Sequence, residues 1–313
     1  MLKIISFQKI WDHAPHNALT DLIRFKDGWY CTFREGNKHV LGANGCIRIL
    51  YSRDLSHWTP VAFFSQEGID LRDPKLSVTP ENKLMLLAGG SQYTQRGKYL
   101  VFQSRVAFSN DGIKWSPFQL VLEPHQWLWR VTWHQGKAYG VAYRFSNPKR
   151  KKNEWIAELF ESNNGVDYKL LSSWDIKGYP NEATLRFFDD GRMIALLRRD
   201  KRFDNHAWIG ISAPPYKEWE WKPTRHYFGG PNFCFIDGVI WAAGRILMPN
   251  PYGYHEKTVL AKVEKDDIIP VLCLPSGGDT SYPGMVYHEG HLWLSYYSSH
   301  EGTTAIYLAC IQL

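Results

Sequence analysis

The sequence predicts an all-β protein, a six-bladed β-propeller. Two observations carry this prediction: an apolar, β-rich segment recurs six times at a spacing of roughly fifty residues, and a hairpin pattern precedes each copy. A third supports it, because no segment shows the sustained 3.6-residue period that is typical of helices. Repeats of a four-stranded unit of this length are the sequence signature of a propeller, in which each unit forms one blade.

The recurring strands and their hairpins can be placed by residue number. The apolar strands are predicted at 47–52, 100–109, 155–162, 206–213, 258–264 and 304–311. The hairpins before them are predicted at 21–35, 73–90, 129–144, 182–198, 231–245 and 282–297. Several hairpins turn at a glycine, as at Asp237-Gly238 and Glu289-Gly290, because tight hairpin turns need a residue that tolerates positive φ.

The first strand, at 3–10, lies before the first hairpin. We expect it to pair with the C-terminal unit, which would close the ring of blades and remove the exposed strand edges that would otherwise remain. No linker or change of composition divides the chain. Residues 1–313 are therefore predicted to form a single propeller domain.

Three turns share one motif. They begin at Ser52, Ser109 and Ser162 and read Ser-x-Asp/Asn-Gly/Leu-x-x-aromatic. The Asp or Asn side chain can bond to the backbone of its own turn, and the aromatic ring fills the space beneath it. We expect these to be structural turns on the side away from the channel mouth. They resemble a shortened Asp-box, a turn common in sialidases and other glycosidase propellers.

Composition narrows the range of partners. Aromatic residues make up 15% of the 313 residues, with 14 Trp, which suits sugar-binding clefts where the C–H faces of a sugar lie on aromatic rings. The formal net charge of +6 mildly favours an anionic substrate. The one basic run, Lys-Arg-Lys-Lys at 149–152, is predicted to be a solvated hairpin tip, so no nucleic-acid partner is expected.

Neither a metal, a cofactor nor a membrane is indicated. The five cysteines are scattered, mostly inside apolar runs, without a C-x-x-C spacing, which predicts buried free thiols in a reducing compartment, the cytoplasm. The N-terminus lacks a signal-peptide pattern, and no run of 18 apolar residues occurs. His13 and His16 have the spacing of metal ligands but no further partner in sequence, so no metal is predicted.

Candidate functional residues come from aligning the hairpins at the channel mouth. The turn at Asp189-Asp190-Gly191 returns the chain to the edge it left, so Glu182 and Arg198 should lie side by side. The same alignment brings charged and phenolic residues of the other hairpins to this edge: Asp21, Asp73, Arg34, Arg245 and Tyr282. Charges do not gather around a narrow channel unless they pair with one another or bind a ligand.

The second half of the chain resembles the exo-sialidase (neuraminidase) superfamily. The resemblance rests on Asn-Glu-Ala-Thr at 181–184, on Arg198, and on Arg245 followed by Tyr282 in Ser-Tyr-Pro. It implies a glycoside hydrolase of an acidic, sialic-acid-like or uronic sugar, with Tyr282 as nucleophile and Glu182 as its base. Arg198 and Arg245 would clamp the sugar carboxylate. These roles suit the residue types, because a phenol needs a base to attack and arginine is a bidentate fork for carboxylates.

The first half departs from that family. No arginine stands at 16–21, where the family has its first clamp arginine, so Arg24, Arg34 or Arg72 would have to replace it. No aspartate stands at 37–39, so Asp73 or Asp21 would have to act as the acid, and Asp73 is the one placed in the predicted catalytic set. The complete set of substrate contacts predicted at the mouth is Arg34, Arg72, Arg198, Arg245, Asp21, His39 and Trp129.

Two other functions stay open. Arg72-Asp73-Pro74 and the turn motif at Ser52 resemble furanosidase and invertase-like propellers, which have five blades. That resemblance implies a mechanism with three carboxylates, namely Asp21, Asp73 and Glu182. The other possibility is a carbohydrate-binding propeller without catalysis, in which each arginine has a structural or ligand-binding role. The exact sugar, the linkage and the oligomeric state are not predicted.

Overall fold

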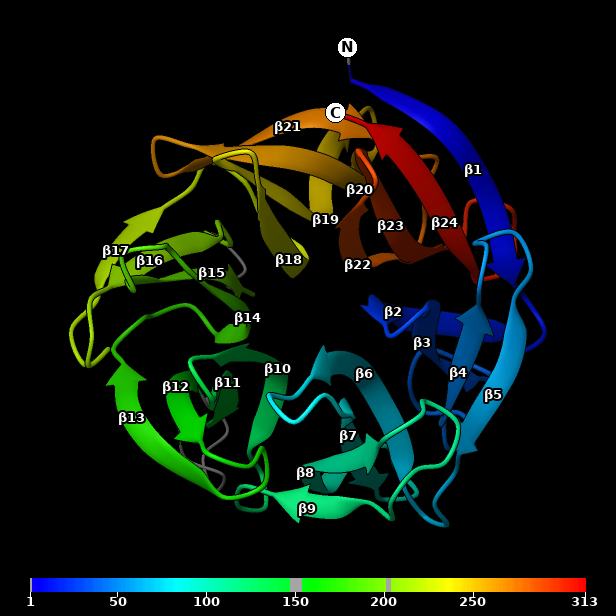
Figure 1. The fold of residues 1–313 in the computed structure, drawn as a ribbon, viewed down its shortest axis with the longest axis horizontal. Coiled ribbons are helices and arrows are strands. Elements are labelled where there is room, and N and C mark those ends of the chain that lie inside the picture. The colour runs from blue at the N-terminus through cyan, green and yellow to red at the C-terminus, as the bar shows by residue number, and fades with distance from the viewer. Residues whose placement is uncertain (1, 147–153, 201–203) are drawn as a thin grey trace.

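The computed structural model describes residues 2–146, 154–200 and 204–313. Within these ranges the chain forms 24 β-strands in six four-stranded sheets, which surround a central channel (Figure 1). The predicted all-β, six-bladed propeller is confirmed. The basic run predicted to be a hairpin tip, 149–152, lies outside the described residues.

Each blade runs outward from the channel as four antiparallel strands (Figure 1). Blade 1 contains β2 (His16–Phe25), β3 (Gly28–Gly36), β4 (Cys46–Ser52) and β5 (Thr59–Phe64). Blade 2 contains β6 (Asp70–Val78), β7 (Leu84–Tyr93), β8 (Tyr99–Ser109) and β9 (Gln119–Val121). Blade 3 contains β10 (Trp127–His134), β11 (Lys137–Phe145), β12 (Trp155–Ser162) and β13 (Tyr168–Trp174).

The second half of the ring has the same arrangement. Blade 4 contains β14 (Pro180–Phe187), β15 (Met193–Arg199), β16 (Trp208–Ser212) and β17 (Glu220–Pro223). Blade 5 contains β18 (Gly229–Ile236), β19 (Val239–Asn250), β20 (Gly253–Glu264) and β21 (Asp267–Cys273). Blade 6 contains β22 (Thr280–His288), β23 (His291–Ser298), β24 (Ala305–Gln312) and β1 (Lys3–Trp11).

The N-terminal strand closes the ring, as predicted. β1 is the outermost strand of blade 6 and pairs antiparallel with β24, for example Phe7 with Ala309 (Figure 1). The predicted third strands agree closely with β4, β8, β12, β16 and β24. The main difference is β20, which begins at Gly253 instead of residue 258. Residues 253–258 pair with β19 but not with β21.

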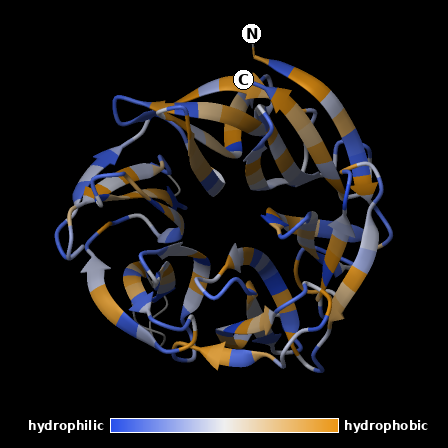
Figure 2. Ribbon diagram, in the orientation of Figure 1, coloured by the Kyte–Doolittle hydropathy of each residue, from blue (hydrophilic) through white to orange (hydrophobic). Residues whose placement is uncertain are grey.

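The hydrophobic core is divided among the interfaces between blades. Among the described residues, six clusters of buried apolar residues occur, and each lies mainly between two neighbouring blades; that of blades 6 and 1 also includes Trp129 of blade 3. One of them packs Ile194 and Leu196 of blade 4 against Ala242 and Val259 of blade 5. Apolar residues therefore recur along the strands of every blade, and polar residues gather in the turns (Figure 2). Each fully buried side chain of this kind contributes about 1.5–3 kcal/mol, so neighbouring blades hold one another in place.

The Ser-x-Asp/Asn turns connect the third and fourth strands of blades 1 to 3. In each turn the serine hydroxyl accepts a hydrogen bond from the backbone N–H three residues later, over 2.8 Å at Ser52, 2.8 Å at Ser109 and 2.9 Å at Ser162. The Tyr30 hydroxyl, near the β2–β3 turn, donates to the carbonyl of Asp111 in the second of these turns. The turns therefore lie at the ends of the hairpins opposite the mouth.

All five cysteines are free thiols, as predicted, but only Cys31 and Cys310 are buried; Cys46 and Cys234 are half-buried and Cys273 is exposed. The described residues include no helix that is long and apolar enough to cross a membrane.

Candidate active site at the channel mouth

A β-bulge at the mouth end of every blade sets the direction of the site residues. In each blade the pairing between the first two strands shifts once, so that two residues of the inner strand oppose one residue of its neighbour. Asp73 and Tyr282 adopt φ values of 50° and 55° there, a backbone conformation that turns the side chain away from the regular alternation. The six bulged pairs are 19–20, 73–74, 129–130, 181–182, 230–231 and 282–283.

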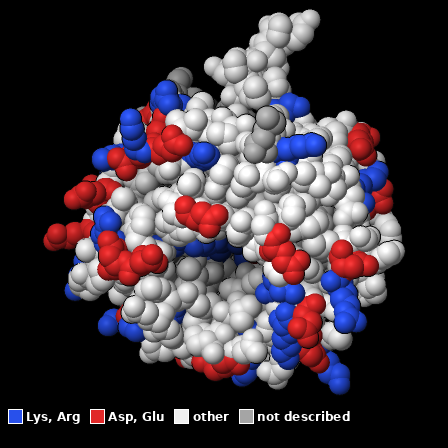
Figure 3. Space-filling view, turned by 45° about the horizontal axis from the view of Figure 1, so that its top comes forward, with Lys and Arg blue, Asp and Glu red and all other residues white. Residues whose placement is uncertain are grey.

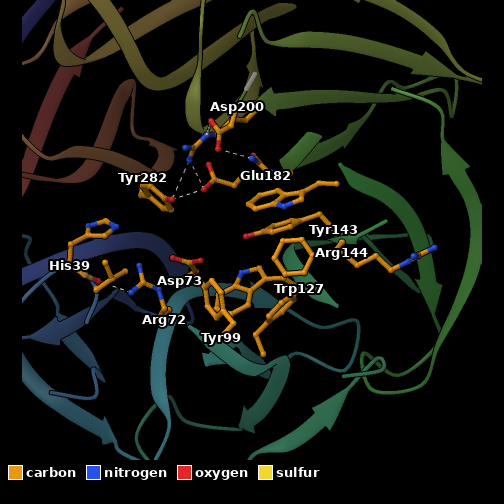
Figure 4. Close-up of a pocket in the computed structure, with 16 residues that line it drawn as sticks. His39, Arg72, Asp73, Tyr99, Trp127, Tyr143, Arg144, Glu182, Asp200 and Tyr282 are labelled. Carbon is orange, nitrogen blue, oxygen red and sulfur yellow. Dashed lines mark hydrogen bonds and ion pairs between the residues drawn. The ribbon is translucent and has the colours of Figure 1, made fainter. Parts of the chain in front are cut away.

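A cavity of about 260 Å³ opens at these bulges. One wall is polar and is lined by Arg72, Asp73, Glu182, Arg198, Asp200 and Tyr282. Figure 4 shows Asp73, Glu182 and Tyr282 pointing into the cavity. The other wall is aromatic, formed by Tyr99, Phe102, Trp127, Tyr143, Phe145 and Trp155. Figure 4 shows Tyr99, Trp127 and Tyr143 side by side on it. From outside, the centre of the ring is hollow, with basic side chains inside it and acidic side chains near its rim (Figure 3). Such a cavity offers hydrogen bonds on one side of a ligand and ring faces on the other.

Tyr282 and Glu182 form the tightest polar contact of the cavity. The Tyr282 hydroxyl donates to Glu182 Oε1 over 2.5 Å, although the two residues belong to blades 6 and 4. Arg198 Nη1 donates to the same carboxylate oxygen over 2.8 Å and lies 3.5 Å from the Tyr282 oxygen. The other oxygen, Oε2, accepts the backbone N–H of Gly230 over 2.8 Å. The carboxylate of Glu182 is therefore fixed at both oxygens.

This environment keeps the shared proton on the Tyr282 phenol and leaves the Glu182 carboxylate ionised. Burial raises the pKa of Tyr282 well above its ordinary value, and the charges of Glu182 and Asp73 raise it further. Burial also opposes ionisation of Glu182, but the Arg198 guanidinium and the hydrogen bonds to the carboxylate outweigh it and hold the pKa of Glu182 below its ordinary value. At rest, a neutral phenol donates to an ionised carboxylate, which is the arrangement of a nucleophile with its base.

Asp73 is the second carboxylate on the polar wall. Its side chain is buried, and Oδ1 has no hydrogen-bond partner among the described residues. Burial raises the pKa of Asp73, and this effect outweighs the opposing charges of Arg72 and Lys75. Glu182 and Asp73 thus share one cavity but have pKa values shifted in opposite directions, the pattern expected of a base and an acid.

Lys75 and Trp129 support the Tyr282 ring from the side of the channel. The centroid of the Trp129 ring lies 5.1 Å from that of Tyr282, and Lys75 Nζ lies 5.3 Å from the Tyr282 centroid. Burial and the nearby charge of Arg130 lower the pKa of Lys75 to about 8. Trp129 is buried and does not line the cavity, contrary to the substrate contact predicted for it, because the bulge at 129–130 turns its ring beneath Tyr282. Trp127 lines the cavity in its place.

The aromatic wall depends on one close backbone approach. A Cβ atom at Gly89 would lie 2.1 Å from Cζ2 of Trp127, so no other residue fits there with the ring in place. Farther along the wall, the rings of Tyr143 and Trp155 stack with centroids 5.0 Å apart and planes 11° apart. Half-buried, stacked rings such as these provide a preformed surface for an apolar ligand face.

A second cavity of about 300 Å³ adjoins the first and shares its His39, Arg198 and Tyr282 side chains. It is completed by Arg245, Glu256, Asp279 and Tyr297. The guanidinium carbons of Arg198 and Arg245 lie 5.5 Å and 5.9 Å from the centroid of the same Tyr227 ring. Both arginines already have carboxylate partners, because Arg198 Nε contacts Asp200 over 2.9 Å and Arg245 Nη1 contacts Glu256 over 3.3 Å.

Arg34 and Arg72 both donate hydrogen bonds to the loop between β3 and β4. Arg34 is 1% exposed, contacts Asp70 over 2.8 Å and donates to the carbonyl of Lys38 over 2.9 Å. Arg72 also contacts Asp70, over 3.2 Å, and donates to the carbonyl of His39 over 2.6 Å. Arg34 lines neither cavity, in contrast to its predicted substrate contact, because Asp70 and the loop occupy its donors. Arg72 still borders the first cavity.

Asp21 lies outside both cavities, although it was expected at the mouth. Both of its carboxylate oxygens lie 3.0 Å from Arg130 Nη1, and Oδ2 also accepts the backbone N–H of Leu76 over 2.9 Å. The reason is the position of each aspartate relative to the β-bulge of its strand. Asp73 lies within the bulge of its blade, whereas Asp21 follows the bulge of blade 1 and is equivalent in position to Lys75. Aligning the hairpins by their first polar residue misses this shift.

The structure thus brings six predicted residues together around the first cavity: Asp73, Glu182, Tyr282, Arg72, Arg198 and His39. Arg245 joins them from the second cavity, while Asp21, Arg34 and Trp129 lie elsewhere. Sequence reasoning missed Asp200, Asp279 and most of the aromatic wall. Two signals were available in the sequence. Asp200 directly follows Arg198 and Arg199, and aromatic residues are concentrated between 127 and 155.

No protein-family model matches this sequence, and no curated protein matches it by sequence. Solved structures do match. A protein of unknown function from Dyadobacter fermentans is similar with a TM-score of 0.84 at 18% identity, covering 100% of this chain and 99% of that one. The NanB sialidase from Streptococcus pneumoniae is similar with a TM-score of 0.68 at 14% identity, covering 97% and 70%.

An α-L-arabinofuranosidase from Fusarium graminearum is also similar, with a TM-score of 0.66 at 12% identity, covering 95% of this chain and 93% of that one. At these identities the likeness establishes the fold alone, and function has to be argued from the side chains. The chain has the fold of the sialidase-like six-bladed propellers.

Proposed function

We propose that this protein is a glycoside hydrolase that acts at the channel mouth, with Tyr282 as nucleophile, Glu182 as its base and Asp73 as the acid. The observation that carries the proposal is the 2.5 Å hydrogen bond from the Tyr282 hydroxyl to an ionised Glu182. The opposite pKa shifts of Glu182 and Asp73 in the same cavity support it. The aromatic wall supports a sugar as the ligand.

In the first step, the Tyr282 oxygen attacks the anomeric carbon while its proton passes to Glu182 Oε1. The glycosidic C–O bond breaks, and Asp73 protonates the departing oxygen. In the second step, ionised Asp73 takes a proton from a water molecule that attacks the same carbon. The bond to Tyr282 breaks, and Glu182 returns the proton to the phenolate oxygen. Each proton and electron pair is thereby accounted for.

The substrate we propose is an acidic sugar whose carboxylate enters the second cavity. Arg198 and Arg245 both border this cavity next to Tyr282, and a guanidinium can bind a carboxylate through two parallel hydrogen bonds. A neutral furanoside is the second candidate. It is favoured by the pairing of Arg198 with Asp200 and of Arg245 with Glu256, which leaves less uncompensated positive charge for an anion.

The experiment is a panel of aryl sialosides, uronides and arabinofuranosides, assayed with wild type and Tyr282→Phe. We expect hydrolysis of one class by wild type and a loss of at least about 10³-fold in the variant, as when other nucleophiles are removed. Tyr168→Phe is the matched control, because that buried hydroxyl has no hydrogen-bond partner among the described residues and lines neither cavity. Binding of a sugar with no hydrolysis of any member would contradict the proposal and indicate a binding protein.

A further inference from the structure

Three side chains of metal-ligand type converge beside the second cavity. His16 begins β2, His39 lies in the loop between β3 and β4, and Asp279 directly precedes β22. His16 Nε2 and His39 Nδ1 lie 3.1 Å and 2.7 Å from the same oxygen, Oδ2 of Asp279. All three ligand atoms lie within 4.8 Å of one another. The sequence offered only His13 as a neighbour of His16, whereas folding supplies two partners from distant positions.

We infer that His16, His39 and Asp279 form a binding site for a divalent transition metal ion of the zinc type. Two imidazoles and one carboxylate are ligands that Zn²⁺ prefers, and sites with three protein ligands keep a position open for an outside group. The spacing fits, because ligand atoms about 2.0–2.2 Å from one ion would lie slightly more than 3 Å apart. The ion would replace the two hydrogen bonds to Asp279 and require only small side-chain shifts.

Hydrogen bonds from neighbouring side chains hold the His39 loop and the Asp279 carboxylate in position. The loop that carries His39 is fixed at two consecutive carbonyls, that of Lys38 by Arg34 over 2.9 Å and that of His39 by Arg72 over 2.6 Å. The remaining oxygen of Asp279, Oδ1, accepts a hydrogen bond from the Tyr297 hydroxyl over 2.8 Å, which orients the carboxylate so that Oδ2 faces the imidazoles. Partners of this kind preorganise metal ligands.

The site is open to solvent on one side. The side chains of His39 and Asp279 are 41% and 28% exposed, and both border the second cavity, whereas that of His16 is 11% exposed. An ion can therefore enter from the second cavity, which Arg198 and Tyr282 also border.

Charge gives the ion a role. In the second cavity the two positive charges of Arg198 and Arg245 face two negative ones, Asp279 and Glu256. A divalent ion would leave this cavity with excess positive charge, and its open position could take a carboxylate or hydroxyl oxygen of the substrate. This role rests on the proposed function, but the binding of the ion does not. Arg245 Nη1, 3.9 Å from Asp279 Oδ1, should make the site weaker than a closed structural zinc site.

The test is titration of the full-length, chelator-treated protein with Zn²⁺ against a chromogenic chelator. We expect one ion per chain in wild type and affinity at least about 10-fold weaker in His39→Ala and Asp279→Asn. The matched control is His57→Ala, because exposed His57 also contacts an aspartate, Asp54, over 2.9 Å but has no third ligand among the residues that the structure describes. It should bind like wild type.

Two results would overturn the inference: no stoichiometric binding by wild type, or equal binding by wild type and His39→Ala. The first would mean that the three residues only tie the loop to blade 6 by hydrogen bonds. Cobalt replacement gives a second readout, since the visible spectrum of bound Co²⁺ should change in His16→Ala if that histidine is a ligand. Neither measurement uses hydrolysis, so failure of the glycosidase proposal and failure of the metal site are separate results.

Discussion

The Tyr282 hydroxyl lies 2.5 Å from a carboxylate oxygen of Glu182, across 100 positions of sequence. The contact exists because both residues belong to the β-bulge of their blades, Tyr282 as the first bulged residue and Glu182 as the second, and the ring brings the two bulges to one cavity. Neither strand alone could bring them together. The mechanism proposed for this protein therefore depends on ring closure as much as on the two side chains.

Replacing Glu182 with Gln should reduce kcat by about 10²- to 10⁴-fold, the usual contribution of a general base, because the amide cannot take the phenol proton. KM should change much less. Glu35→Gln is the control, since Glu35 also pairs with an arginine, Arg48, but lines neither cavity. Steady-state kinetics of the two variants would decide the matter, and an unchanged kcat in Glu182→Gln would exclude its role as base.

Replacing Asp73 with Asn should have an effect that depends on the leaving group. An alkyl glycoside needs a proton on its departing oxygen, whereas a nitrophenolate departs without one. We therefore expect a loss of about 10²-fold or more for the alkyl substrate and a smaller loss in the first step for the nitrophenyl substrate. Equal losses for both, measured in single-turnover experiments, would count against Asp73 as the acid.

The pH profile of kcat/KM should be bell-shaped. Glu182 must be ionised, and its pKa lies below the ordinary 4.5, so activity should rise with pH below that value. Asp73 must be protonated, and its pKa lies above the ordinary 3.8, so activity should fall as pH increases through that raised value. The optimum should therefore lie between the two pKa values, above that of Glu182 and below that of Asp73. A profile that lacks either limb would show that other groups control the reaction.

Replacing Gly89 with Ala should weaken sugar binding. The added Cβ would lie 2.1 Å from Trp127, so the ring must move from its place on the aromatic wall. We expect KM to rise by about 10-fold, the scale of one lost aromatic contact, with a smaller change in kcat. Gly277→Ala is the control, because a Cβ there would lie 3.7 Å from its nearest neighbours and Gly277 lines neither cavity. If Gly89→Ala keeps the wild-type KM, the aromatic wall does not hold the substrate.

Deleting residues 2–11 should destabilise the whole ring. β1 forms the outer edge of blade 6, and its Trp11 packs in the cluster between blades 6 and 1. Loss of a buried tryptophan side chain alone costs about 3–5 kcal/mol, and the deletion also exposes the edge of β24. We expect a lower free energy of unfolding and aggregation on heating, measured by denaturant titration and light scattering. Unchanged stability would show that ring closure is not required.

Much of the fold could be predicted because its signal is local. A turn such as Asp190-Gly191 specifies a hairpin wherever it stands, and repetition of that signal indicated the number of blades. The hairpin also predicted the contact of Glu182 with Arg198, found at 2.8 Å. Strand ends were less certain where pairing continues beyond the sheet, as at Gly253.

The site was less predictable because it depends on register and on distant partners. One bulge separates Asp73 in the cavity from Asp21 outside it, and one bulge turns Trp129 beneath Tyr282. Sequence shows no marker for these shifts, since the bulged residues differ from blade to blade. Asp279 could not be connected with its histidines because more than two hundred residues separate them.

The most direct test of the account is to trap the covalent intermediate. The aryl glycoside that the protein hydrolyses would be replaced by an analogue with fluorine beside the anomeric carbon and a good leaving group, which forms the intermediate faster than water removes it. Peptide mass spectrometry should then place the sugar on the Tyr282 oxygen. A sugar attached to Asp73 or Glu182 instead would contradict the assignment of Tyr282 as nucleophile.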